Sequence, residues 1–379
     1  MSAATGKRVE TIDVFRGVAI LLVVLFHFTA RLPAEALNVT GAAAPPVFFG
    51  WAGVFFFFAI SGYCIYLTLE RSATISLFLA RRFSRLYPAF LAAAIFLFAY
   101  GMLAPVPSIP QADFHERPST LIDLVTNLLF VGDGRWVNGS FWSIAVEIKF
   151  YVGLGLLAVL IPDRQKLATI FTWVSLAAAP FWMVAMGFAL IGGSHLPQKL
   201  IGLATIAPYL PFFAIGILAR TQKPTTPLGA LLFALCFIEA AAVMLLTALD
   251  GSSDVGAAVI TTILTLGLLG ALVAFAAGVP IPHVPVLSRG LAGVGFLSFS
   301  WYLVHENLGA SFLSNLNRLM PNSLAVLATI GATLLIAWVF AELVEWRFRR
   351  PVEAFALRVL NGATGMIGRL RGKALPVKA

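Results

Sequence analysis

Charged residues are scarce in this sequence. Asp, Glu, Lys and Arg make up 11% of its 379 residues, whereas 60% of the residues are hydrophobic. A soluble domain usually carries about 25% charged residues, so this chain has too few to cover a surface that faces water. The mean hydropathy of +0.92 agrees. The scarcity excludes an ordinary soluble globular protein and predicts a surface that faces lipid.

Cysteine and clustered metal ligands are also scarce. The two cysteines, Cys64 and Cys236, both fall inside apolar runs, where cysteine packs as a small hydrophobic residue. No His/Cys cluster has the spacing of a metal site, and the sequence has no glycine-rich phosphate loop and no G-x-S-x-G elbow. We therefore expect no metal, no bound cofactor and no serine-hydrolase chemistry of that type.

Long apolar runs dominate what is present. Backbone groups cannot stay unpaired in hydrocarbon, so only a helical bundle or a closed barrel can span a membrane. The runs are about 20 residues long and do not alternate with period two, which favours helices. The sequence predicts an all-α, polytopic membrane helical bundle with about ten transmembrane helices. We place them near residues 12–30, 47–69, 87–104, 141–161, 167–191, 200–219, 228–249, 255–277, 291–314 and 323–346.

The basic residues indicate how the chain is oriented. The formal charge of +9 could indicate a nucleic-acid partner, but these residues lie in short loops between apolar runs. With the N-terminus inside, 19 Lys and Arg residues fall on the inner side and five on the outer side, which is the positive-inside pattern. We expect a plasma (inner) membrane protein with both termini cytoplasmic. Residues 1–352 form one transmembrane domain, and residues 353–379 form a basic cytoplasmic tail, helical at first, that lies on anionic lipid headgroups.

One loop is longer than the others. Residues 105–140 are expected outside, and they include an apolar stretch over residues 121–131 that is too short to span the bilayer. This stretch is either re-entrant or lies at the interface. Because loops longer than about 15 residues often have a function, the segment is a candidate for shaping an outward-facing acceptor cleft.

The first apolar run contains two ionisable residues, Arg16 and His27. A charge at mid-bilayer costs at least about 2.5 kcal/mol, so such residues are functional candidates. Eleven steps of about 100° make nearly three turns, so both side chains share one helix face, about 16 Å apart. One alternative for Arg16 is a snorkelling anchor paired with Asp13, and one for His27 is a structural histidine bonded to a neighbouring helix.

Glu147 lies in the fourth run at a depth comparable with that of His27. A carboxylate at this depth needs a partner, and an imidazole is a suitable one. We predict that His27 and Glu147 pair as an oriented general base. The alternative is a buried ion pair that only joins two helices. Lys149 faces a different side of the same helix.

Three further groups of polar residues occur near the apolar runs. Arg82 and Arg85 share a face before the third run, so their two guanidinium groups are suited to phosphate oxygens; the alternative is plain orientation charge. Ser61 and Tyr63 contribute hydroxyls beside Gly62, which allows a close backbone approach. His305 and Glu306 form a second ionisable pair, placed to line the same cavity as His27.

These residues belong to six motifs that occur in order along the chain. The motifs are Arg16 with His27, the phenylalanine-rich stretch from Phe55 to Tyr63, Arg82 with Arg85 and Pro88, the set Trp142, Ser143, Glu147, Phe150 and Tyr151, the segment from Ser298 to His305, and the segment from Glu342 to Pro351. Together they resemble the membrane-bound acyltransferase 3 family over almost the whole chain. Ile144, Lys149, Phe299 and Glu306 depart from the family pattern.

The resemblance implies an acyl-CoA donor, commonly acetyl-CoA, on the cytoplasmic side and a carbohydrate or glycolipid acceptor outside. Arg16, Arg82 and Arg85 would hold the CoA phosphates. His27 would deprotonate a sugar hydroxyl or accept the acyl group itself, with Glu147 orienting it. The remaining expected substrate-binding residues are Ser61, Tyr63, Trp142, Ser143, Tyr151 and His305.

Some relatives carry a fused extracytoplasmic transferase domain, so a separate partner of that kind is one possibility. The rival functions are a transporter or flippase of a sugar or lipid-linked substrate, and a structural or sensor protein. A transporter predicts paired, broken helices in two related halves.

Overall fold

The computed structural model describes residues 3–39, 41–103, 120–131, 136–252, 254–281 and 284–373. Every regular element in these ranges is helical, which confirms the all-α class. The α-helices are α1 (Ala3–Thr29), α2 (Ala52–Glu70), α3 (Ile75–Leu103), α4 (Leu121–Leu128), α5 (Phe141–Leu160), α6 (Arg164–Leu190), α7 (Leu196–Thr205), α8 (Leu210–Thr221), α9 (Pro227–Gly251), α10 (Val255–Ala276), α11 (Pro285–Phe296), α12 (Ser298–Leu316), α13 (Asn322–Phe340) and α14 (Trp346–Lys373). A 3₁₀ turn, η1 (Ala207–Tyr209), precedes α8, and a π-helical turn, η2 (Ala341–Glu345), joins α13 to α14.

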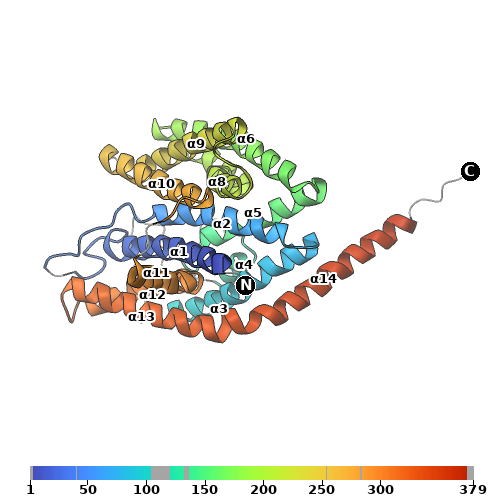
Figure 1. Cartoon of the computed structure of the whole chain (residues 1–379). Coiled ribbons are helices and arrows are strands. Elements are labelled where there is room, and N and C mark those ends of the chain that lie inside the picture. Colours follow the sequence, from blue (N-terminus) through green and yellow to red (C-terminus); the bar gives the residue numbers. More distant parts are fainter. Residues whose placement is uncertain are drawn as a thin grey trace, which may run out of the picture.

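The helices form two groups with α2 between them (Figure 1). On one side lie α6, α8, α9 and α10, and α2 packs against α8 and α10. On the other side lie α1, α11, α12 and α13, and α2 packs against α1. The third helix, α3, contacts α5 and α12 and runs beside the first part of α14.

Eight helices in the described ranges are long and apolar enough to cross a membrane, or nine if one bent pair counts as a span. The chain is therefore a multi-pass membrane protein. The prediction of about ten spans differs in the segment 291–314, which the structure divides between α11 and α12. Fourteen of the 19 residues of α12 are buried, so this helix lies inside the bundle and has polar residues where a lipid-facing helix has apolar ones.

The third span begins earlier than predicted. We expected it near residue 87, but α3 starts at Ile75 and includes Arg82 and Arg85 in its first three turns. Pro88 lies inside this helix and does not end it. The two arginines therefore lie on the transmembrane helix itself, where Arg82 is only 6% exposed.

One span is broken. Helix α7 and the segment η1–α8 meet at an angle of 68°, at Ile206, whose φ of 52° is left-handed. Lys149 on α5 donates from Nζ to the carbonyl oxygen of Leu203 at 2.7 Å, so it satisfies a backbone group near the end of α7. The transporter alternative predicts two such breaks in related halves, and the described ranges contain one bent pair.

The contact between α2 and α8 depends on two glycines. A Cβ atom added to Gly62 would lie 2.2 Å from the carbonyl oxygen of Phe213, and one added to Gly216 would lie 2.0 Å from that of Ala59. The helices therefore approach backbone to backbone, as small residues allow in membranes. This confirms the close approach expected at Gly62.

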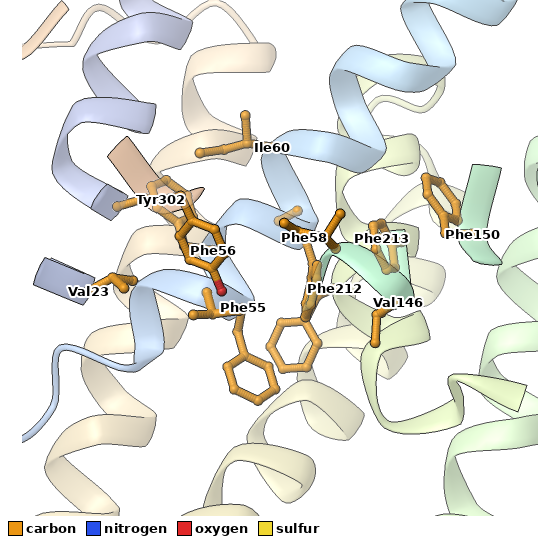
Figure 2. Packing of buried hydrophobic residues seen from close by; sticks show 14 of the residues in the cluster. Val23, Phe55, Phe56, Phe58, Ile60, Val146, Phe150, Phe212, Phe213 and Tyr302 are labelled. Carbon is orange, nitrogen blue, oxygen red and sulfur yellow. The ribbon is translucent and has the colours of Figure 1, made fainter. Parts of the chain in front are cut away.

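Phenylalanine rings fill the core around α2 (Figure 2). Phe55 and Phe58 of α2 meet Phe212 and Phe213 of α8 with ring centroids 4.9 and 5.0 Å apart. Phe213 also stacks on Phe150 of α5, with centroids 4.0 Å apart. These rings fix the position of α5 relative to α2, and with it the position of the polar residues on α5.

The predicted tail and outer loop are described in part. Helix α14 continues from η2 through Pro351 and projects away from the bundle, which confirms an initial helix in the tail (Figure 1). Within the loop 105–140, α4 is a short helix with a capping box between Thr120 and Asp123. Residues 104–119, 132–135, 282–283 and 374–379 lie outside the described residues, and with them Arg117, Arg135, His115, His283 and Lys378.

Candidate active site

A pocket with an empty volume of about 770 Å³ lies among α1, α2, α3, α5 and α12. Seven of the predicted site residues line it, from four helices that are distant in sequence. They are Arg16, Ser61, Arg82, Arg85, Ser143, Glu147 and Tyr151. We call this cavity the arginine pocket.

Three guanidinium groups give the pocket its positive charge. Arg16 contacts the Asp13 carboxylate at 3.4 Å, as the anchor alternative predicts, but it also lines the pocket. Arg82 donates from Nη2 to the Thr68 hydroxyl at 2.8 Å. Its buried Nε has no hydrogen-bond partner among the described residues. A buried guanidinium donor without a partner suits a charged acceptor such as a phosphate oxygen.

Glu147 lies in the same pocket, and hydroxyl groups hold it. Ser61 donates to Glu147 Oε1 at 2.6 Å, and the Tyr151 hydroxyl donates to the same oxygen. The predicted pairing of Glu147 with His27 is wrong. In the structure these hydroxyls are the partners of Glu147, and another carboxylate is the partner of His27. The packing explains this, since α5 packs against α2, α3 and α6, whereas α1 packs against α2, α11 and α12.

The partner of His27 is Glu306. His27 Nε2 lies 3.1 Å from Glu306 Oε1, and the Glu306 side chain is only 4% exposed. The other ring nitrogen, Nδ1, lies 2.7 Å from the carbonyl oxygen of Val23. A carbonyl can only accept, so Nδ1 carries the proton of the neutral ring, and Nε2 is the nitrogen that faces Glu306 and can take up a second proton.

A second imidazole lies beside this pair. His305 is fully buried; its Nδ1 lies 2.9 Å from the carbonyl oxygen of Tyr302 and its Nε2 lies 3.4 Å from His27 Nδ1. The two imidazole rings are 4.9 Å apart and nearly perpendicular. We call His27, His305 and Glu306 the histidine cluster.

The loop before α5 fixes the carboxylate of this cluster. A Cβ atom added to Gly139 would lie 2.5 Å from Glu306 Oε1, so the glycine leaves room for the carboxylate. Asn138 donates to the carbonyl oxygen of Leu303 at 3.0 Å and accepts from the backbone of Asn307 at 3.1 Å. Asn138 and Gly139 are not selected in the sequence analysis. The sequence pattern that could have identified them is the small, polar Asn-Gly-Ser triplet directly before the first residues of α5.

Comparison with known proteins identifies the family. A family model described as an acyltransferase domain matches residues 9–342. The chain belongs to the acyltransferase 3 family. BcsY of Komagataeibacter xylinus, provisionally named a membrane-bound transacylase, is 30% identical over 194 residues, which are 46% of this chain and 45% of that protein. The match therefore spans less than half of the relative's length. No solved structure matches the chain significantly.

In this acyltransferase 3 family member, Tyr302 lies between the two groups of site residues. Its side chain lines the arginine pocket, and its hydroxyl is 2.6 Å from the hydroxyl of Ser143. Its ring lies 5.5 Å from the ring of His305, and its carbonyl oxygen is within reach of His305 Nδ1. The pocket and the histidine cluster are therefore adjacent, because Tyr302 of α12 lines the pocket and contacts His305.

Three predicted substrate-binding residues lie outside the lining of the arginine pocket: His305, which belongs to the histidine cluster, Tyr63 and Trp142. Tyr63 is buried and packs near Phe275, with ring centroids 6.5 Å apart. Trp142 packs against Phe58 and Tyr209. Both rings take part in helix packing, because Tyr63 faces α10, and Trp142 faces α2 and the 3₁₀ turn η1.

Proposed function

We propose that this protein transfers an acyl group, in the simplest case acetyl, from acyl-CoA to a hydroxyl of a cell-envelope or exported carbohydrate. The family supports an acyltransferase, and the neighbouring pocket and histidine cluster support this reaction. The observation that carries the proposal is the arginine pocket. Three guanidinium groups and a buried donor without a partner lie beside an ionisable cluster.

The donor half of the reaction uses the arginine pocket. Arg16, Arg82 and Arg85 bind phosphate oxygens of CoA through charge-assisted hydrogen bonds. Apolar pocket residues such as Phe57 and Ile60 line the path of the pantetheine arm. The thioester then reaches the Tyr302 side of the pocket, next to the histidine cluster.

The proton-transfer half uses His27. The acceptor hydroxyl gives its proton to His27 Nε2, which is unprotonated in the neutral ring, while its oxygen attacks the thioester carbonyl carbon. The new C–O bond forms, the C–S bond breaks, and the CoA thiolate takes the proton back from the imidazolium. Glu306 stabilises that imidazolium, which is the role that the sequence analysis expects of Glu147. Glu147 stays in the proposal as a group of the donor pocket.

Orientation follows from the same arrangement. We propose that the arginine pocket opens towards the cytoplasm and that α12 is the tenth crossing, so that both termini are cytoplasmic in the plasma (inner) membrane. A periplasmic alkaline phosphatase fused after Ala379 is then inactive. An active fusion would overturn this topology.

The proposal has a direct test. Purified protein in detergent, given radiolabelled acetyl-CoA and an envelope carbohydrate fraction, incorporates label into carbohydrate. Donor binding is measured separately by equilibrium dialysis of the labelled donor. Absence of both donor binding and label transfer contradicts the proposed function. Label transfer that requires an added soluble protein indicates a separate transferase partner.

A further inference from the structure

A second hollow lies near the histidine cluster, and none of the residues that line it lines the arginine pocket. It has an empty volume of about 1510 Å³ and lies where the ends of α1 and α9 meet the starts of α2 and α10. Three aromatic side chains line it, namely Phe26, Phe48 and Trp51. Arg31 and Asp254 line it as well, with the hydroxyl-bearing residues Thr247, Ser252 and Thr261. We call it the outer groove.

The aromatic side of the outer groove is held against α1. The Thr29 hydroxyl accepts from the backbone N–H of Val47 at 2.9 Å and donates to the carbonyl oxygen of Leu25 at 2.7 Å. This bridge ties the segment with Phe48 to the last turn of α1. Trp51 is fixed by its contact with Phe55, with ring centroids 5.5 Å apart. The rings are thus positioned by the fold and do not depend on a ligand to order them.

The outer groove adjoins the histidine cluster through one side chain. Phe26 lines the groove, and its ring lies 5.2 Å from the ring of His27 in an edge-to-face arrangement. Tyr302, whose ring lies 5.5 Å from that of His305, lines the arginine pocket. Along α1, His27 lies between Arg16, which lines the arginine pocket, and Ala30 and Arg31, which line the outer groove.

We propose that the outer groove is the binding site of the carbohydrate acceptor. The proposal rests on the proposed function, and it assigns the acceptor to a different place from the loop 105–140 and Trp142. The negative faces of Phe48 and Trp51 attract the C–H edges of a sugar ring. Arg31 donates to sugar hydroxyls and Asp254 accepts from them, and the hydroxyl nearest Phe26 is the one that reaches His27.

The polar lining decides between a sugar and a lipid chain. Asp254 uses Oδ1 to cap α10 through the backbone N–H of Ala257 at 3.0 Å, and Oδ2 is not part of that cap. An alkyl chain in the groove would cover the Asp254 carboxylate without hydrogen bonding to it, which is costly. A polyhydroxylated ligand hydrogen bonds to it. A concave, partly aromatic site with a few polar groups is also the usual form of a small-ligand site.

The test separates acceptor binding from donor binding. The full-length protein is given radiolabelled acetyl-CoA and the exported polysaccharide fraction of the cells that make it. We expect Phe48→Ala and Trp51→Phe to lower label transfer at least about 5-fold at low polysaccharide concentration, with recovery at high concentration. The affinity for acetyl-CoA stays within about 2-fold of wild type. Two variants are used because Trp51 also packs on Phe55, and Trp51→Phe keeps an aromatic ring there.

Matched variants control for the loss of an aromatic side chain. Phe96 on α3 is 41% exposed, compared with 38% for Phe48, and Trp173 on α6 is 46% exposed. Phe96→Ala and Trp173→Phe are expected to transfer label as wild type does.

The outcomes have distinct meanings. If label transfer by both groove variants depends on polysaccharide concentration as it does in wild type, the acceptor site is overturned and the proposed function remains intact. Label found in a lipid without sugar also overturns the acceptor site. A wild-type protein that neither binds the donor nor transfers label overturns the proposed function, and the acceptor site with it.

Discussion

Glu147 and Glu306 are carboxylates within the helical bundle, and their surroundings differ. Glu147 accepts hydrogen bonds from the hydroxyls of Ser61 and Tyr151 in a pocket that also holds three arginines. Glu306 faces an imidazole at 3.1 Å in a cluster with a second imidazole beside it. Hydroxyls fix a carboxylate in place, whereas an imidazole exchanges a proton with it. The comparison therefore supports the proposal that the histidine cluster transfers protons and the arginine pocket binds anions.

The largest expected effect is on His27, which lies at the centre of the histidine cluster. Removal of a general base usually costs about 10²- to 10⁴-fold in rate, so His27→Ala should lower label transfer by that factor. Acetyl-CoA affinity should be unchanged, because we propose that the donor phosphates bind in the arginine pocket. Near-normal turnover of His27→Ala at equal protein levels would show that the base lies elsewhere.

The next prediction tests the comparison directly. We expect Glu306→Gln to lower the rate of transfer about 10²-fold, because the amide no longer stabilises the imidazolium. Glu147→Gln should lower it less than about 10-fold. The double variant His27→Ala with Glu306→Gln should be little worse than His27→Ala alone, since the two groups act as one unit. A larger loss from Glu147→Gln than from Glu306→Gln would reverse the two assignments.

A third prediction concerns the arginine pocket. Hydrogen bonds to charged groups contribute about 1.5–3 kcal/mol each, so Arg82→Ala should weaken acetyl-CoA binding about 10- to 100-fold. Wild-type donor affinity should also fall with added salt. Arg358 is an exposed arginine on α14 outside the pocket, and Arg358→Ala serves as the control. Unchanged donor affinity in a double Arg82→Ala, Arg85→Ala variant would show that these residues only set the orientation of the chain in the membrane.

The smallest expected effect is at Gly139. An added methyl group would lie 2.5 Å from Glu306 Oε1 and must displace the carboxylate from His27. We expect Gly139→Ala to lower the transfer rate about 10-fold, a partial loss of the pair's contribution. Donor affinity should remain that of wild type. Gly153 on the following helix, α5, has nothing within 4 Å of an added Cβ, so Gly153→Ala should behave as wild type. Equal activity in both alanine variants would mean that the carboxylate position is not critical.

Much of the candidate site could be predicted from the sequence. Charged and titratable residues inside apolar runs are costly, and this rule selected Arg16, His27 and Glu147. The same rule marked His305 and Glu306 as an ionisable pair, although not as partners of His27. Gly139 could not be selected in this way, because its role is to leave space for a carboxylate from another helix.

The depth of a residue along its span did not predict its partner. Glu147 and His27 were expected at comparable depths, and this led to a pairing that the structure contradicts. Contact between two transmembrane helices also requires that they be neighbours and that the two side chains face each other. Neither property follows from residue spacing on separate helices.

The sequence alone determined the membrane class, the helical architecture and the presence of buried ionisable residues. These depend on composition and on the length of apolar runs, which act locally and hold for any arrangement of the helices. Only the tertiary structure decided the partners. Backbone contact of α2 with α8 through Gly62 and Gly216, and the packing of α12 against α1, bring Glu306 to His27 and leave Glu147 with hydroxyls. Such pairing depends on which helix faces meet, and close packing of the whole bundle sets those faces.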